Sequence, residues 1–349
     1  MKRTLLFMSL MLGLVVSAMV FVSCGDDEVE PNGGNTPGQN AEQNTTDVAV
    51  TGAVSEVSAM WAQISGVVNL DLIASSYTNV EVGVEVSTTE DFKEKKRTKA
   101  SDVVGRKFSV RVTPLSTDTK YYYRTYVSVS SLSYDYYGET YSFTTKELPS
   151  VNGHYYVDLG LPSGTLWAYT NVGTSSPEEY GDYFAWGETT TKSTYNWSTY
   201  KWCNGSSSTL TKYNTSSSYG TVDNKTELEL SDDAAYVNWG SNWRMPSQEQ
   251  FNELIYSGYT TSTWTTLNGY YGQMITSKLN GNSVFLPAAG CRYDGSLYAA
   301  GSCGYYWSRT LYTGSPGYAW GLYFGSDYVN TRNYYRCDGL SVRPVRLSE

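Results

Sequence analysis

A helix start near residue 247 is the feature that most constrains the fold of this chain. Residues 242–246 read NWRMP, and Ser247 follows with Gln250 three positions later, which is the pattern of a capping box. An apolar stripe with helical spacing comes next: Phe251, Leu254 and Ile255. Most other apolar stretches alternate with period two, so the segment predicts a short helix packed on small β-sheets. A second short helix is predicted at residues 232–237.

The C-terminal tail has a strongly biased composition. Residues 279–348 contain ten Tyr and no Lys, Glu, Gln or Met, although these four types are common just upstream. Tyr, Ser, Gly and Asn are favoured in binding loops, because Tyr offers a large amphipathic face at low entropic cost. The four missing types share one further property, since none has a codon that ends in a pyrimidine. The tail therefore predicts a displayed recognition surface, either diversified through such codons or fixed in a chain that is rich in Tyr throughout.

Charge and histidine content exclude several classes of function. The formal net charge of −9 argues against nucleic acid and against a polybasic membrane patch, because both kinds of binding rest on Lys and Arg. The single histidine, His154, leaves almost no material for histidine-based catalysis. No Cys/His set has the spacing of a zinc site, and no glycine-rich phosphate loop follows a strand. We expect no cofactor and no metal, and calcium-dependent sugar binding is disfavoured because the Asn and Asp residues are scattered.

The first residues have the pattern of a secretory signal peptide. A positive start precedes an apolar run at residues 5–22, which is also about long enough to be weighed as a transmembrane anchor. Residues 21–24 read FVSC and resemble a bacterial lipobox, which implies that Cys24 is lipidated. The acidic residues 25–30 resemble the surface-export signal of Bacteroidetes lipoproteins. Residues 31–46 are rich in Gly, Asn, Pro and Thr, and predict a flexible tether.

A period-two pattern begins at residue 47. Six stretches alternate like strands, with turn-rich segments between them as in a β-sandwich: 48–54, 60–67, 80–87, 108–114, 121–129 and 140–144. Residues 115–121 read LSTDTKY, which resembles the Leu-x-x-x-Thr-x-Tyr corner of fibronectin type III domains, and Trp61 stands where that family buries an early Trp. The resemblance implies a fibronectin type III-like sandwich that acts as a spacer. A ligand-binding role for this module stays open.

About two hundred residues follow the boundary at 148–150, which is enough for one well-buried core. Residues 157–167 read VDLGLPSGTLW and residues 178–188 read EEYGDYFAWGE, and both closely resemble the Fibrobacter succinogenes major paralogous domain. The NWRMPS helix start is similar to that of C-type-lectin-like folds of the formylglycine-generating-enzyme branch. The resemblance covers nearly all of residues 151–347 and implies a mainly β chain with an α+β, C-type-lectin-like head. Residues 197–219 predict a long surface excursion.

The tail also resembles the variable proteins of diversity-generating retroelements, which use this lectin-like fold. In those proteins adenines of selected codons are randomised, so that AAC-type codons become NNY. Trp307 and Trp320 cannot arise in this way and belong to the scaffold. Because alternate residues of a strand share a face, Gly321, Tyr323, Gly325 and Asp327 are expected to be displayed above Trp320, Leu322 and Phe324. The resemblance implies that ligand is bound by Tyr293, Asp294, Leu297, Tyr298, Cys303, Tyr305, Arg309, Leu311, Tyr312, Gly321, Tyr323, Gly325, Asp327, Tyr328, Asn330, Thr331, Asn333, Tyr334, Tyr335, Cys337 and Asp338.

With Cys24 lipidated, four cysteines remain: Cys203, Cys291, Cys303 and Cys337. Outside the cytoplasm an even number suggests disulfides, and four cysteines allow three pairings. Chance cysteines are the alternative, since one base separates Tyr and Cys codons. The formylglycine-generating relatives act through a cysteine pair, but Cys291 and Cys303 lack a matching motif. We therefore expect no enzymatic activity.

The sequence as a whole predicts a lipid-anchored receptor. It would be an outer-membrane lipoprotein, exposed on the cell surface, that binds an unknown protein or glycan on another cell, a phage or a host surface. The alternatives are an invariant glycan-binding adhesin and a formylglycine-generating-type enzyme. The predicted parts are a signal peptide at 1–23, the lipidated cysteine and tether at 24–46, the sandwich at 47–147 and a C-type-lectin-like ligand-binding domain at 151–349.

Overall fold

The computed structural model describes residues 47–347, which are mainly β-sheet with short helices. The predicted signal peptide, the lipidation site Cys24 and the tether lie outside the described residues. Within the described part, no helix has the length and apolar character that a membrane crossing requires.

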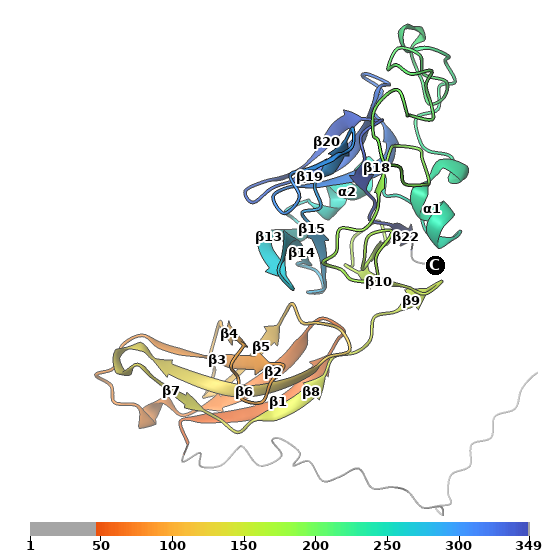
Figure 1. Ribbon diagram of the computed structural model, residues 1–349. Helices are drawn as coiled ribbons and strands as arrows, with labels where there is room; N and C mark the ends of the chain where they lie inside the picture. Colours follow the sequence, from red (N-terminus) through yellow and green to blue (C-terminus); the bar gives the residue numbers. More distant parts are fainter. Residues whose placement is uncertain (1–46, 348–349) are drawn as a thin grey trace, which may run out of the picture. The chain divides into compact units, whose positions relative to one another are not determined.

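The first part of the described chain folds into two antiparallel sheets (Figure 1). One sheet has the order β1-β2-β5, and the other has the order β4-β3-β6-β7, with β8 also paired to β6. Two 3-10 turns lie in the connections: η1 Leu70–Leu72 and η2 Ser130–Leu132. The strands are β1 Ala49–Val57, β2 Ala62–Val68, β3 Val80–Ser87, β4 Lys95–Lys99, β5 Lys107–Val112, β6 Lys120–Val129, β7 Tyr134–Tyr137 and β8 Tyr141–Thr144.

This arrangement agrees with the predicted fibronectin type III-like sandwich. All six predicted strands are present within a few residues of their expected bounds. Two further strands, β4 and β7, were not predicted. The sequence of β4 is KKRTK, which has no apolar alternation, and β7 has only four residues, YDYY. Both strands are held by pairing with a neighbour rather than by a pattern of their own.

The sandwich core follows from the alternation along its strands. In β5 the residues Phe108, Val110 and Val112 are buried while the residues between them are exposed. The predicted corner is closed by a hydrogen bond in which the backbone N–H of Ser116 donates to Tyr121 Oη at 2.9 Å. This bond fixes the turn that enters β6.

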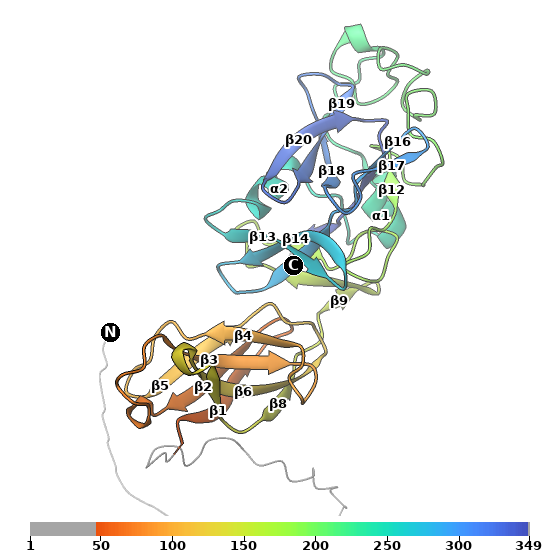
Figure 2. The ribbon, with the colours of Figure 1, turned by 60° about the vertical axis from the view of Figure 1, so that its left-hand side comes forward.

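The rest of the described chain builds four small sheets (Figure 2). Their strand orders are β22-β11-β10-β9, β12-β21-β18-β19-β20, β13-β14-β15 and β16-β17. The strands are β9 Ser150–Val151, β10 His154–Asp158, β11 Thr165–Ala168, β12 Tyr183–Phe184, β13 Thr260–Leu267, β14 Tyr270–Ser277, β15 Ser283–Pro287, β16 Cys291–Tyr293, β17 Ser296–Tyr298, β18 Gly304–Leu311, β19 Tyr318–Phe324, β20 Val329–Tyr335, β21 Leu340–Ser341 and β22 Val345–Leu347.

Both predicted helices are present. Helix α2, Gln248–Leu254, begins at the predicted capping box: Ser247 Oγ accepts from Gln250 N, and Gln250 Oε1 accepts from Ser247 N at 2.8 Å. Helix α1, Ala234–Trp239, has Asp233 as its N-cap, whose carboxylate accepts two backbone N–H groups of the first turn. The remaining 3-10 turns are η3 Ser217–Tyr219 and η4 Leu230–Asp232.

Two fully buried arginines cross-link distant segments of this part of the chain. Arg343 donates to Asn171 Oδ1 at 2.8 Å and to the carbonyl oxygens of Ala168, Tyr169 and Phe285 at 2.9–3.2 Å. All four acceptors are uncharged, and burial lowers the pKa of Arg343 to about 10.

Arg336 organises the predicted surface excursion in the same way. It donates to Tyr200 Oη at 2.9 Å and to the carbonyl oxygens of Lys212 and Tyr213, both at 3.0 Å. Although residues 197–219 contain no strand, Leu210 and Tyr213 are almost inaccessible to solvent. The excursion is therefore packed against the rest of the domain, since Leu210 shares a buried cluster with Tyr183 and Cys337, and Tyr213 shares one with Trp186.

Replacing Arg343 tests the importance of this cross-link. Arg343→Met keeps the apolar stem but leaves four buried oxygens without their donor, and a lost hydrogen bond to a charged group costs about 1.5–3 kcal/mol. We expect the free energy of unfolding to fall by at least about 3 kcal/mol in urea denaturation. Arg332→Met, at an exposed position of β20, is the matched control and should change stability by less than about 0.5 kcal/mol. Equal effects of the two substitutions would contradict a structural role for Arg343.

Candidate functional site

Four tyrosines gather on one face of the central sheet, and we call them the tyrosine cluster: Tyr305, Tyr323, Tyr328 and Tyr334. The register pairs Tyr305 of β18 with Tyr323 of β19, and Tyr323 in turn with Asn330 of β20. Directly paired residues of antiparallel strands point to the same side, so these side chains share one face. Figure 2 shows β18, β19 and β20 side by side.

The rings of the cluster are in mutual contact. Tyr305 lies 4.9 Å from Tyr323 and 5.4 Å from Tyr334, measured between ring centroids. The ring of Tyr328 is 5.1 Å from that of Tyr323, and its hydroxyl donates to Tyr323 Oη at 2.6 Å. Such edge-on and tilted contacts restrain the rings before any ligand arrives. The cluster is therefore a pre-ordered aromatic surface.

The opposite face of the same strands is core. Tyr306, Leu322 and Phe324 have no exposed surface and pack into the hydrophobic cluster that also contains Phe251 and Leu254 of α2. Alternation along β18 and β19 therefore places one set of side chains in this cluster, while the other side carries the tyrosines together with Trp307 and Ala319, which are buried in a second hydrophobic cluster. The predicted positions of Leu322 and Phe324 beneath a displayed face agree with this geometry.

Gly321 allows the rings to lie close to the sheet. A Cβ at this position would lie 2.6 Å from the carbonyl oxygen of Tyr306 and 3.4 Å from the ring of Tyr334. Any side chain at position 321 would thus require the backbone to move. Because Gly321 has no side chain, the ring of Tyr334 can lie over β19.

The hydroxyl groups of the cluster differ in whether they have a hydrogen-bond partner. Tyr334 Oη is buried without a hydrogen-bond partner among the described residues, and burial raises the pKa of its phenol. The hydrogen bond from Tyr328 raises the pKa of Tyr323, so the phenols of Tyr323 and Tyr334 stay neutral at physiological pH. The guanidinium of Arg332 lies 4.9 Å from the ring centroid of Tyr323. The face thus offers neutral hydroxyls and one exposed cation.

The β16–β17 hairpin lies next to the cluster in the fold. The backbone N–H of Gly290 donates to the carbonyl oxygen of Cys303 at 2.8 Å. This bond joins the segment between β15 and β16 to the start of β18. The hairpin carries two exposed tyrosines, Tyr293 and Tyr298, with ring centroids 6.4 Å apart. Cys303 Sγ lies 3.8 Å from Tyr323 Oη.

All four cysteines of the described chain are free thiols, and no disulfide joins any of the possible pairs. Burial is the main cause that raises the pKa of Cys291 to about 11. A thiol with this pKa is almost entirely protonated at neutral pH, and the thiolate is the nucleophilic form of cysteine. Cys291 therefore lacks the activation that a catalytic nucleophile needs.

The structure brings together only part of the predicted ligand-binding set. Eight members are exposed: Tyr293, Asp294, Leu297, Tyr298, Asp327, Tyr328, Asn330 and Tyr335. Nine are half-buried: Cys303, Tyr305, Arg309, Tyr312, Tyr323, Thr331, Asn333, Tyr334 and Asp338. Four are buried, where contact with a ligand would require movement: Leu311, Gly321, Gly325 and Cys337.

Several members lie away from the tyrosine cluster. Tyr335 and Asn333 alternate with Tyr334 along β20 and so point to the other side, where Tyr335 stacks on Tyr318 at 4.4 Å. Thr331 donates to Asn252 beside α2, at 3.0 Å. Arg309 donates to Gln250 Oε1 at 3.0 Å and so braces the capping box rather than a ligand surface.

Sequence reasoning missed Arg332, which shares the face of the cluster. Arg332 stands two residues from Asn330 and two residues from Tyr334 in β20, so the three side chains point to the same side of the strand. This spacing identifies Arg332 as part of the face once the strand and its register are known. Within residues 47–347, no group of three or more His, Cys, Asp and Glu side chains is arranged to hold a metal ion.

Comparisons with known proteins cover parts of the chain. Residues 272–345 match a family described as "Domain of unknown function (DUF8237)". No curated protein matches the chain.

Similar solved structures include the sensor domain of the anti-sigma factor RsgI4 from Pseudobacteroides cellulosolvens. It is 17% identical over 30% of this chain and 100% of that chain, with a TM-score of 0.24. The neighbours also include the fibronectin type III domain of human fibronectin type III domain containing protein 3. That domain is 14% identical over 33% of this chain and 92% of its own length, with a TM-score of 0.23.

Asp338 gives this region a testable dependence on pH. Burial, with a smaller contribution from Asp294, raises the pKa of the Asp338 carboxyl to about 7. Because the pKa is about 3.9 in an unfolded chain, the folded state favours the protonated carboxyl, and this stabilisation is lost as the pH rises from about 4 to about 7.

Asp338→Asn removes the titration. The stability of the variant relative to the parent should increase by about 2–4 kcal/mol between pH 4.5 and pH 8, as measured by urea denaturation. Asp327→Asn, at an exposed position, is the control and should show little change between the two pH values. A stability difference for Asp338→Asn that does not vary with pH would show that Asp338 titrates normally.

Proposed function

We propose that this protein is a surface-displayed lipoprotein that binds a ligand through the tyrosine cluster and the neighbouring β16–β17 hairpin. The observation that carries the proposal is the division of one sheet into two faces. One face is packed as core, while the other carries four contacting tyrosines, of which Tyr328 is exposed and Tyr305, Tyr323 and Tyr334 are half-buried. A rigid sheet with pre-ordered aromatic rings is a favourable support for a binding site, because little conformational entropy is lost on binding.

The chemistry of the face suits a ligand with both apolar and hydrogen-bonding surface. The rings supply flat contact area, and the hydroxyl of the exposed Tyr328 can hydrogen-bond to a ligand. Asn330 and Arg332 are exposed on the same face and add polar groups at its margin. A protein or a glycan on another cell, a phage or a host surface meets these requirements.

The proposed setting follows from the sequence resemblances. Residues 151–349 would be a Fibrobacter succinogenes major paralogous domain with a C-type-lectin-like fold, supported by the motif strings and by the capping box of α2. Lipidation at Cys24 would anchor the chain in the outer membrane, and the sandwich would act as a spacer. Incorporation of labelled palmitate, lost in Cys24→Ala, tests the anchor. The proposal includes no enzymatic step.

Substitutions in the tyrosine cluster test the site directly. The detergent-purified full-length protein would be applied to a glycan array and, with a fluorescent label, to bacterial and epithelial cells. Tyr323→Ala removes the ring that contacts both Tyr305 and Tyr328, so binding should weaken by about tenfold or more. Tyr256→Ala is the control, because Tyr256 is 55% exposed beyond the end of α2. Equal binding by both variants would contradict the proposed site.

Diversification of the tail by a retroelement is part of the proposal, and the gene itself tests it. Sequencing the 3′ end with its downstream DNA should reveal a near-identical template copy and a reverse transcriptase. Differences between the copies should fall on adenines in codons of exposed residues such as Tyr293, Tyr298 and Tyr328. An invariant tail without a template copy would favour a fixed glycan-binding adhesin, which the array experiment would identify by sugar binding.

A further inference from the structure

Strand β20 forms one edge of the sheet that carries the tyrosine cluster. It is the last strand in the order β12-β21-β18-β19-β20, and it pairs with β19 over seven residues without a bulge. Within residues 47–347, no strand or isolated bridge pairs with its other side. No residue of β20 is buried. The strand therefore has a free and accessible edge along its whole length.

The hydrogen-bond pattern shows which backbone groups of β20 point toward β19. In an antiparallel pair, directly opposed residues alternate between pairs that exchange both backbone bonds and pairs that exchange none. The backbone N–H of Gly325 donates to the carbonyl oxygen of Tyr328 at 3.0 Å, just before β20 begins. Steps of two from this bond along the register give the positions that bond to β19: Asn330, Arg332 and Tyr334.

The alternate residues of β20 direct their backbone groups away from the sheet. These residues are Val329, Thr331 and Asn333. Their three N–H and three C=O groups have no hydrogen-bond partner in the part of the chain that the structure describes. At the far end of the strand, the N–H of Arg336 donates to the carbonyl oxygen of Gly317 at 3.1 Å, which agrees with the same alternation.

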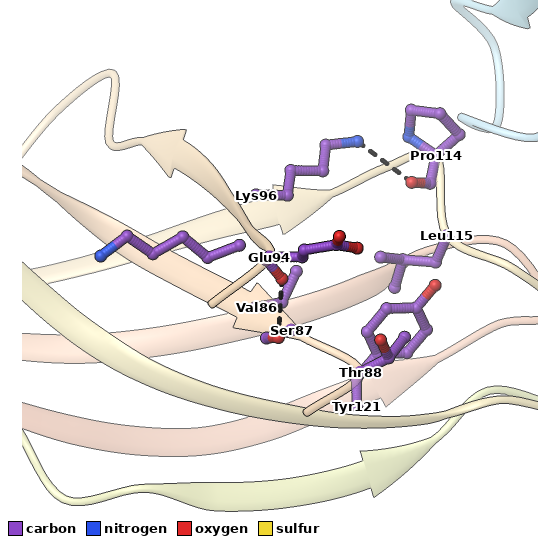
Figure 3. Close-up of a pocket in the computed structure, with 9 residues that line it drawn as sticks. Val86, Ser87, Thr88, Glu94, Lys96, Pro114, Leu115 and Tyr121 are labelled. Atoms are coloured by element: carbon purple, nitrogen blue, oxygen red, sulfur yellow. Dashed lines mark hydrogen bonds between the residues drawn. The ribbon is translucent and has the colours of Figure 1, made fainter. Parts of the chain in front are cut away.

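Strand β4 shows how the same protein protects another edge. Natural proteins discourage strand addition with charged side chains, prolines, bulges and inward-pointing charges. Four of the five residues of β4 are cationic, and Figure 3 shows Lys96 turned toward Pro114, whose carbonyl oxygen accepts from Nζ at 3.0 Å. The sequence of β20, VNTRNYY, has one charged residue and no proline. The edge of β20 is therefore open to a further strand.

The one charged residue of β20 has no counter-ion of its own. Arg332 is exposed on the face of the tyrosine cluster, with its guanidinium 4.9 Å from the ring centroid of Tyr323. It forms no ion pair with a carboxylate of residues 47–347, whereas Arg309 pairs with Glu227. The guanidinium carries a fork of N–H donors that matches a carboxylate. Strand β20 contains no carboxylate, so a second copy of it would leave Arg332 unpaired.

We propose that an extended, acidic segment of a partner protein adds to the free edge of β20 as a further strand. This inference rests on the function proposed above and names the class of its ligand as a protein. The backbone of the segment bonds to the outward N–H and C=O groups of Val329, Thr331 and Asn333. Main-chain bonds of this kind supply affinity, and the alternating side chains supply specificity.

The register of the added strand decides which side chains meet. A residue directly opposite Arg332 points to the same face, so an Asp or Glu at this position forms an ion pair with the guanidinium. The residues two positions before and after it lie beside Asn330 and Tyr334. The segment thus extends the surface of the tyrosine cluster sideways across the edge of the sheet.

A peptide array tests the expected charge preference. Heptapeptides with the frame Thr-Val-Thr-X-Thr-Val-Thr, where X is each of the twenty amino acids, are probed with the labelled, detergent-purified full-length protein. Peptides with Asp or Glu at X should bind at least about threefold more protein than those with Lys or Arg, because opposed charges attract across paired strands. Equal binding of acidic and basic peptides, or no binding by any member, would overturn the proposal.

Reversing the charge of the protein should reverse the preference of the array. Arg332→Glu places a carboxylate on the same face, so peptides with Lys or Arg at X should now bind at least about threefold better than those with Asp or Glu. Lys278→Glu is the matched control, because it makes the same change in net charge at an exposed position outside β20. The control should keep the preference of the parent protein. An Arg332→Glu variant that still prefers acidic peptides contradicts the proposed register.

Asn333→Pro tests the role of the backbone. Proline removes an outward N–H but no bond to β19, and edge strands tolerate proline at such positions. Binding of the acidic peptides should fall by at least about tenfold, while Asn333→Ala, which keeps the N–H, should bind like the parent. Peptides with methylated backbone nitrogens should also fail to bind the parent protein. Undiminished binding of the methylated peptides would show that side chains alone capture the segment, and strand addition would be wrong.

The assay with bacterial and epithelial cells separates this inference from the proposed function. If Tyr323→Ala loses binding and Asn333→Pro keeps it, the tyrosine cluster binds the ligand without strand addition, and only this inference fails. If both variants bind like the parent, both proposals fail. Sedimentation velocity covers the remaining occupant: a dimer of the parent protein that is absent in Asn333→Pro would assign the edge to a second copy and overturn the inference.

Discussion

The buried guanidinium of Arg343 is the interaction on which the arrangement of the tyrosine-bearing sheet depends. It binds oxygen atoms from residues 168–171 and from Phe285, and so joins segments more than a hundred residues apart in the chain. Strand β21 ends two residues before Arg343 and pairs with Tyr306 of β18. Because a guanidinium can satisfy several carbonyls at once, one side chain ties the end of β11 and the residues that follow it to β15. The position of β18, and with it Tyr305, follows from this anchoring.

Local sequence patterns predicted much of the fold. The capping box at Ser247 places α2 within one residue of its observed start, because both of its hydrogen bonds are made between neighbours in sequence. Six of the eight strands of the sandwich were predicted equally well, since each of these half-buried strands carries its own alternation of apolar and polar residues. Strand β4 was not, because its charged residues are held in the sheet by pairing with β3 rather than by burial. The C-type-lectin-like identity of the head stays an inference from resemblance.

The site was predicted less completely, because amino-acid composition does not show to which face of a strand a side chain points. Tyr323 and Tyr335 belong to the same biased tail, but the register of β19 and β20 places them on opposite faces. Leu311 and Cys337 fit the codon pattern and are nevertheless buried. Gly321 fits it as well, yet the close approach of Tyr306 O leaves no room for a side chain. The alternation of buried and accessible side chains along each strand was the useful signal. A bulge in the pairing of β18 with β19 interrupts this alternation between Trp307 and Leu311.

Strand β4 also affects whether copies of this protein can pair edge to edge. Four of its five residues are cationic, and it forms one margin of its sheet. An open margin exposes unpaired backbone groups that invite the same margin of a second molecule to dock. Two such margins would bring eight cationic side chains together, although Lys95, Arg97 and Lys99 form ion pairs with Glu85, Asp135 and Glu81. Lys96, whose amino group donates to the carbonyl oxygens of Thr113 and Pro114, would also have to be displaced. This edge therefore disfavours the pairing of copies into continuous fibrils through β4.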